Sequence, residues 1–101
     1  MQQKATVGRI VHVLLDPEHN NGADVAPAII TRVWGEPYTP GTAALERQTV
    51  NVNVFGDSHA EPIWLTSIWV FDERPTDEQL AALNQSNPKG YRAVAFWPPR
   101  I

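Results

Sequence analysis

The sequence predicts one small domain that is mainly β and contains one short helix. Five segments are rich in β-branched, aliphatic and aromatic residues, and polar stretches with Pro and Gly separate them. One stretch, near residues 76–85, carries the start and stop signals of a helix. The chain has 101 residues, which is enough for one hydrophobic core and too few for two domains.

The first expected strand covers residues 7–15, which are mostly β-branched or aliphatic. A turn should follow it, because Pro17 presets φ and the Asn-Gly pair beyond it tolerates positive φ. The second expected strand covers residues 25–34 and has Pro27 near its start, where an edge position tolerates the missing N–H. Residues 35–48 contain several Pro and Gly residues and are expected to form a long loop with at most one turn of helix.

Residues 49–55 form the clearest expected strand, because Val and Asn alternate in it with a period of two. The Val side chains therefore share one face, and Asn51 and Asn53 share the other. The fourth expected strand covers residues 63–71 and is apolar on both faces, which a five-stranded monomer would struggle to cover, so we expect a homo-oligomer. Its expected faces are Ile63, Leu65, Ser67, Trp69 and Phe71 on one side, and Trp64, Thr66, Ile68 and Val70 on the other.

Thr76 and Gln79 fit a capping box, in which each side chain bonds to the backbone N–H of the other residue. A helix should run from there to about Gln85, and residues 91–97 form the last expected strand. Five short strands, with one helix between the fourth and the fifth, favour a small five-stranded antiparallel SH3-like barrel in which the helix plugs or caps one open end. A curved antiparallel sheet with the helix packed on it is the alternative.

Composition and charge exclude several classes of protein. The chain has no Cys, so it has no disulfide, no thiolate metal ligand and no thiol nucleophile. Its net charge is −3 and its Lys and Arg residues are scattered, which argues against general nucleic-acid binding. No apolar run approaches the roughly 20 residues of a membrane span. The first residues also lack the pattern of a signal peptide, so a cytoplasmic location is expected.

The sequence predicts neither an enzyme nor a metal or cofactor site. The three His residues lack the spacing that makes a zinc site convincing. Residues 56–60 contain Ser58 and His59 and superficially resemble a nucleophile elbow, but that motif needs a strand-to-helix turn within a much larger α/β sheet. No phosphate-binding glycine-rich loop is present.

Arg and aromatic residues supply the candidate ligand contacts. Arg32 and Trp34 lie two residues apart on one expected strand, so both side chains should emerge on one face. A nucleotide could stack its base on the indole and place its phosphate at the guanidinium. Asn side chains can bond to the edge of a base or an amide. The predicted ligand-binding residues are Arg32, Trp34, Asn51, Asn53, Trp64 and Arg92.

Five segments carry a resemblance to known sequences, namely residues 7–13, 27–34, 50–55, 64–67 and 96–98. They include an Arg-Val-Trp element, a Val-Asn-Val-Asn-Val-Phe run and a Trp-Leu-Thr-Ser element. In this order they resemble a group of small uncharacterised bacteriophage and prophage proteins. The resemblance implies a phage gene product in the cytoplasm of a bacterial host, and it brings no assigned activity.

These observations lead to two hypotheses about function. The leading one is a small non-enzymatic phage binding protein, a counter-defence protein that sequesters a nucleotide-derived immune signal of the host. The alternative is a phage accessory protein that binds a host or virion protein through a Trp-rich sheet face. An enclosed pocket would favour the first hypothesis, and a flat apolar patch would favour the second. Neither hypothesis involves a membrane.

Overall fold

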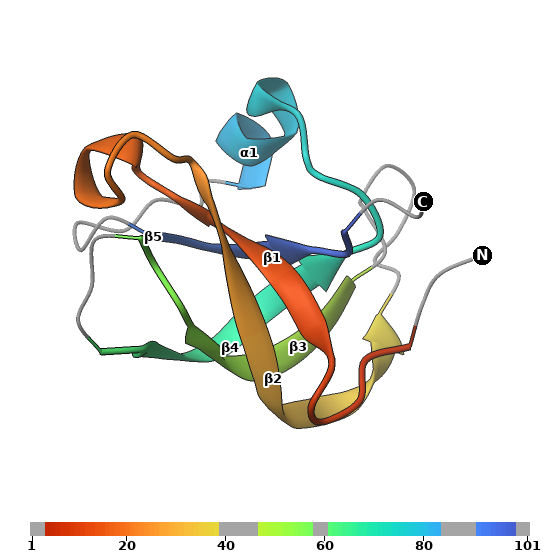
Figure 1. The fold of residues 1–101 in the computed structure, drawn as a ribbon. Coiled ribbons are helices and arrows are strands. Elements are labelled where there is room, and N and C mark those ends of the chain that lie inside the picture. Colours follow the sequence, from red (N-terminus) through yellow and green to blue (C-terminus); the bar gives the residue numbers. More distant parts are fainter. Residues whose placement is uncertain (1–3, 39–46, 58–60, 84–90, 99–101) are drawn as a thin grey trace.

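Five strands wrap into a closed barrel in the computed structural model, which describes residues 4–38, 47–57, 61–83 and 91–98 (Figure 1). One short helix stands on the outside of the barrel between the fourth and fifth strands. The elements are β1 (Ile10–Leu15), β2 (Val25–Tyr38), β3 (Arg47–Val54), β4 (Ile63–Phe71), α1 (Asp77–Leu83) and β5 (Tyr91–Phe96). The mainly β fold class predicted from the sequence is confirmed, and an SH3-like barrel is consistent with it.

The strands follow one another around the barrel in sequence order, and β5 closes the barrel against β1. Four of the pairings are antiparallel, but β4 and β5 run parallel. The sequence predicted an antiparallel barrel, and the difference arises from the helix. A tight hairpin would return the chain antiparallel, whereas a crossover through α1 brings β5 back to the end of the barrel at which β4 began.

The interior of the barrel is filled by small and medium aliphatic side chains. The Val side chains of β3 lie inside, as their alternation predicted, and each is fully buried. Burial of a Val side chain contributes on the order of 1.5–3 kcal/mol, so this row is a large part of the core. The interior cluster consists of Ala5, Val11, Val13, Leu15, Ala26, Ala28, Ile30, Val50, Val52, Val54, Leu65, Ile68, Val70, Ala95 and Trp97.

A second apolar cluster lies on the outer side of β1, β4 and β5, beneath α1. Phe71 from β4 is 1% exposed there and packs with Leu80 of the helix. Leu14, Val94 and Phe96 complete the cluster, and Trp69 packs against it. The helix therefore covers an outer face of the sheet. The sequence predicted that it would plug or cap an open end of the barrel, and this prediction is wrong.

Two β-bulges next to Asn51 change which side chains point outward. Ile30 pairs with Val52 and Arg32 pairs with Asn51, so β2 carries one extra residue at Thr31. The pairing of β3 with β4 also shifts, and it leaves Thr66 and Ser67 together opposite Asn51. Ser67 takes a φ of 57°, which fits a bulge and not a regular strand.

The bulge in β4 corrects the faces that simple alternation predicted for this strand. Ile63 and Leu65 point into the barrel, and beyond the bulge Ile68 and Val70 do so as well. Trp69 and Phe71 therefore lie on the outer side with Trp64, not on the same face as Leu65. Because α1 covers Phe71, one strand can be apolar on both sides within one chain. The two apolar sides of β4 therefore no longer support the expected homo-oligomer, which stays a prediction.

Several strand boundaries differ from the prediction, and the two largest differences are at the start of β1 and at the end of β2. β1 begins at Ile10 because Gly8, with a φ of 93°, turns the chain just before it. β2 continues past residue 34 to Tyr38, where a loop was expected, because Gly35 adopts a φ of 67° beside a second register shift. β2 also pairs on both sides and is no edge strand. Pro27 is tolerated since the β2–β3 ladder begins one residue later, at Ala28.

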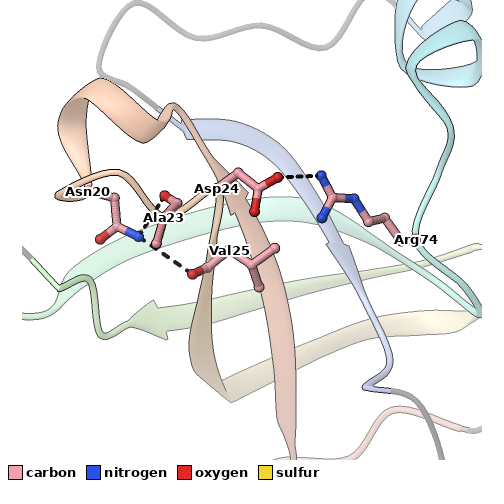
Figure 2. A network of polar contacts seen from close by, with 5 residues as sticks. All are labelled: Asn20, Ala23, Asp24, Val25 and Arg74. Carbon is pink, nitrogen blue, oxygen red and sulfur yellow. Dashed lines mark hydrogen bonds and ion pairs between the residues drawn. The ribbon is translucent and has the colours of Figure 1, made fainter.

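The β1–β2 connection is the predicted turn, and polar contacts hold it in place. Asn20 is 1% exposed and donates to the carbonyls of Ala23 (3.0 Å) and Val25 (3.5 Å) (Figure 2). Its Oδ1 atom accepts the backbone N–H of Asp57 at 2.6 Å, which ties this turn to the end of β3. Asp24 pairs with Arg74 at 2.7 Å, and this contact links the turn to the segment before α1.

The capping box predicted for α1 is present, and both of its hydrogen bonds are formed. Gln79 N donates to Thr76 Oγ1 at 3.1 Å, and Thr76 N donates to Gln79 Oε1 at 2.9 Å. Asp77 and Glu78 in the first turn add favourable charge at the positive end of the helix dipole. The structure describes the helix to Leu83, and the expected end near Gln85 lies outside the described residues.

We expect Thr76→Ala to lower the free energy of unfolding by about 1 kcal/mol, because the substitution removes the hydroxyl that accepts from the Gln79 N–H. Urea denaturation followed by tryptophan fluorescence measures the change. Thr76→Ser, which keeps the hydroxyl, is the matched control and should behave like the wild type. A midpoint equal to that of the wild type in Thr76→Ala would mean that α1 unfolds independently of the barrel.

Candidate functional site

The outer sides of β2, β3 and the first half of β4 form a surface that α1 does not cover. We call it the tryptophan face and define it as Ile10 together with the outward side chains of residues 29–34, 49–53 and 64–67. Trp34 and Trp64 are 42% and 59% exposed and stand at diagonally opposite corners, one on β2 and one on β4. Four of the six predicted ligand-binding residues present exposed or half-buried side chains on this face, namely Arg32, Trp34, Asn53 and Trp64.

Arg32 and Trp34 share one face, as their spacing predicted, and the structure also stacks the guanidinium of Arg32 on the ring of Trp34. The bulge at Thr31 lies before both residues, so they keep the same parity and both point outward. The guanidinium carbon of Arg32 lies 4.0 Å from the centre of the Trp34 ring. Such a contact attracts through the ring quadrupole and contributes about 0.5–1 kcal/mol at an exposed site. The pair thus presents a positive charge at a defined position on the face.

Asn51 holds this corner of the face together from beneath. Its Oδ1 atom accepts three donors at 2.9 Å: the indole Nε1–H of Trp34, the hydroxyl of Thr66 and the backbone N–H of Ser67. Asn51 is only 8% exposed. The sequence predicted a ligand contact for this residue, but the structure engages its oxygen within the protein. Asn51 therefore positions Trp34 and the β4 bulge.

An apolar row crosses four strands at the other side of the face. Ile10 pairs with Ile29, Ile29 pairs with Asn53, and Asn53 pairs with Trp64. Ile10 and Ile29 are 54% and 38% exposed. Three interstrand spacings of roughly 4.8 Å give the row a length of about 14 Å. Asn53 separates Trp64 from the two isoleucines in this row, and several exposed large apolar side chains on one sheet surface are typical of an interaction surface.

Sequence reasoning found the tryptophans of this face and missed the isoleucines. Ile10 and Ile29 stand in apolar segments that do not show which side chains face outward. Only the strand register places them outside the barrel, in one row with Asn53 and Trp64. The other two tryptophans do not take part in the exposed corners. Trp97 is buried in the barrel interior, and Trp69 packs against the cluster under α1.

Arg92, the sixth predicted contact, is not brought to the tryptophan face. Its backbone lies in β5, which pairs with β1 and β4 and not with β2 or β3. Its side chain lies outside the described residues. Ser58 and His59, the residues of the elbow-like loop, also lie outside them.

The structure adds little to the other kinds of site. In the described parts of the chain, no three His, Asp or Glu side chains group closely enough to hold a metal ion. His12 lies edge-on to Phe96, with ring centres 5.6 Å apart. Asp16 accepts the backbone N–H of Glu18 at 3.0 Å and caps the short 3₁₀ turn Pro17–His19. None of the described helices has the length and apolar character needed to cross a membrane.

The chain matches no family model, and no curated protein or solved structure is significantly similar to it. The resemblance to small phage proteins therefore stays a prediction, and the function has to be argued from the tryptophan face itself.

Proposed function

We propose that the protein is a non-enzymatic binding protein that docks another protein on its tryptophan face. The observation that carries this proposal is the exposed apolar row of Ile10, Ile29 and Trp64, with Trp34 at the opposite corner. Tryptophan and arginine supply much of the binding energy at protein interfaces, because each combines a large contact area with a polar group. Both residue types stand on this face, Arg32 and Trp34 on β2 and Trp64 on β4.

The contrast between the two outer faces of the barrel supports the proposal. On one side the chain builds an apolar outer patch around Phe71 and covers it with α1. On the other side, Trp64 remains 59% exposed and Ile10 54% exposed. Covering such side chains contributes roughly 25 cal/mol for each Å² removed from water, and a protein partner is the simplest cover for a sheet surface. The resemblance to phage proteins supports a host or virion protein as that partner.

Sequestration of a nucleotide-like immune signal is the second candidate, and the stacked Arg32–Trp34 pair is the observation that favours it. Two features of the geometry make this candidate weaker than the sequence suggested. The guanidinium of Arg32 already lies over the ring on which a base would stack. The Asn51 oxygen, a candidate for reading the base, accepts three donors of the protein.

We expect Trp64→Ala to abolish partner binding and to change stability little, because the side chain is 59% exposed. Native mass spectrometry of the protein isolated from a bacterial host measures the retained partner and the subunit count together. The wild type should carry a second protein chain that Trp64→Ala lacks. Val7→Ala is the control, since Val7 is 68% exposed and lies outside the tryptophan face.

Three other outcomes of this measurement would each change a conclusion. A retained mass of nucleotide size, lost in Arg32→Ala and Trp34→Ala, would favour the second candidate. A partner that survives in Trp64→Ala would remove the tryptophan face from the proposal. A complex with one copy of this chain would contradict the expected homo-oligomer.

A further inference from the structure

The charge of the tryptophan face differs from that of the rest of the chain. Ile10 and residues 29–34, 49–53 and 64–67, which form the face, contain one cation, Arg32, and no acidic residue. The whole chain has eleven acidic residues against eight Lys and Arg. Described acidic side chains gather elsewhere, notably before and within the first turn of α1 at Asp72, Glu73, Asp77 and Glu78. The face therefore carries a net positive charge on an acidic protein.

The single cation of the face is also held in place. Asn51 fixes the indole of Trp34 through a 2.9 Å hydrogen bond, and the guanidinium of Arg32 lies over that indole at 4.0 Å. A cation–π contact orients the guanidinium without using its N–H groups as donors to an oxygen. Those N–H groups form a fork that matches the two oxygens of a carboxylate. Because the guanidinium is oriented before binding, Arg32 loses less side-chain entropy when it pairs with a carboxylate of a partner.

We propose that the partner protein presents an acidic segment whose carboxylate pairs with Arg32 while an apolar side chain of the same segment packs on Trp64. This inference rests on the proposed function and names the chemistry of the partner. Charge complementarity supports this inference, because a carboxylate is the group that pairs best with the oriented guanidinium of Arg32 beside an apolar surface.

The strand geometry sets the spacing of the two anchors. Arg32 and Trp64 stand two strands apart and two residues apart along the sheet, which corresponds to about 12 Å between their Cα atoms. An extended segment advances roughly 3.3 Å per residue, so the acidic and apolar residues of the partner are separated by about three to four positions. Thr66 and Ser67 lie between the anchors on the protein and are exposed.

Selection of a random peptide library on the immobilised wild-type protein tests the inference. We expect the selected peptides to share an Asp or Glu about three to four positions from an aromatic or large aliphatic residue. Arg32→Gln should weaken their binding about tenfold, and raising the salt concentration should weaken binding to the wild type but not to Arg32→Gln. Arg74→Gln is the matched control, because it removes a cation that pairs with Asp24 away from the face.

The other outcomes separate this inference from the proposed function. Peptides that depend on Trp64, lack an acidic residue and ignore Arg32→Gln would overturn the inference and leave the docking face intact. A selection without any peptide sensitive to Trp64→Ala would overturn both. In a third outcome, a short single-stranded oligonucleotide displaces the peptides and loses its own binding in Arg32→Gln. That result would identify a nucleic acid, and not an acidic protein segment, as the partner.

Discussion

Phe71→Ala should lower the free energy of unfolding by about 3–5 kcal/mol, the cost of deleting a buried aromatic side chain and leaving a cavity. Phe71 is 1% exposed and joins β4 to the helix through Leu80 and to β5 through Phe96. Its ring also meets Trp69 edge-on, with centres 6.3 Å apart. Urea denaturation measures the loss. Hydrogen exchange at the Leu80 N–H, which donates to the Thr76 carbonyl, reports whether α1 leaves the sheet.

Phe71→Leu is the control for this result and should cost about 1 kcal/mol, because it keeps most of the apolar contact. The tryptophan face lies on the other side of the barrel, so partner binding by folded Phe71→Ala should equal that of the wild type. A loss in Phe71→Ala no larger than that in Phe71→Leu would show that the cluster under α1 contributes little to stability.

Asn51→Ala should lower the free energy of unfolding by about 2–3 kcal/mol, because one substitution removes the acceptor of three hydrogen bonds. The effect should also reach the candidate site. Without its bond to Asn51, the indole of Trp34 loses its fixed orientation, and the Arg32 guanidinium loses the ring on which it rests. Urea denaturation measures the stability, and exchange of the Trp34 indole proton in NMR spectra measures the orientation.

Asn51→Asp separates the loss of the acceptor from other effects of substitution at this position. A carboxylate oxygen accepts the same donors, and Arg32 pairs with this position in the strand register, so we expect this variant to stay close to the wild type at neutral pH. An indole proton of Trp34 that stays protected in Asn51→Ala would mean that the ring is held by packing and not by Asn51.

The proposals for function depend on the exposed residues of the face, and stability alone does not test them. Trp64 and Arg32 are exposed, so their replacement should leave the barrel folded. This separates variants that lose binding from variants that lose structure. The peptide selection and the native mass measurement therefore report on function, while Phe71 and Asn51 report on the framework that presents it.

Several features followed directly from the sequence because they depend on local chemistry. The capping box needs only Thr76 and Gln79 three residues apart, and both of its hydrogen bonds are present. The inward row of Val in β3 and the shared face of Arg32 and Trp34 follow from the two-residue period of a strand. The turn after β1 follows from Pro17 and the Asn-Gly pair, whose φ preferences are properties of single residues.

What tertiary structure alone decided depends on contacts between strands that are distant in sequence. One extra residue in a strand reverses the facing of every residue beyond it, and no local signal marked the bulge at Thr66 and Ser67. The register that places Ile10 and Ile29 beside Trp64 is likewise set by pairing across the barrel. The sequence by itself thus determined the number and order of the strands, the helix cap and the shared face of Arg32 and Trp34. The barrel decided which apolar side chains α1 covers and which remain on the tryptophan face, because register and bulges, not composition, set the direction of each side chain.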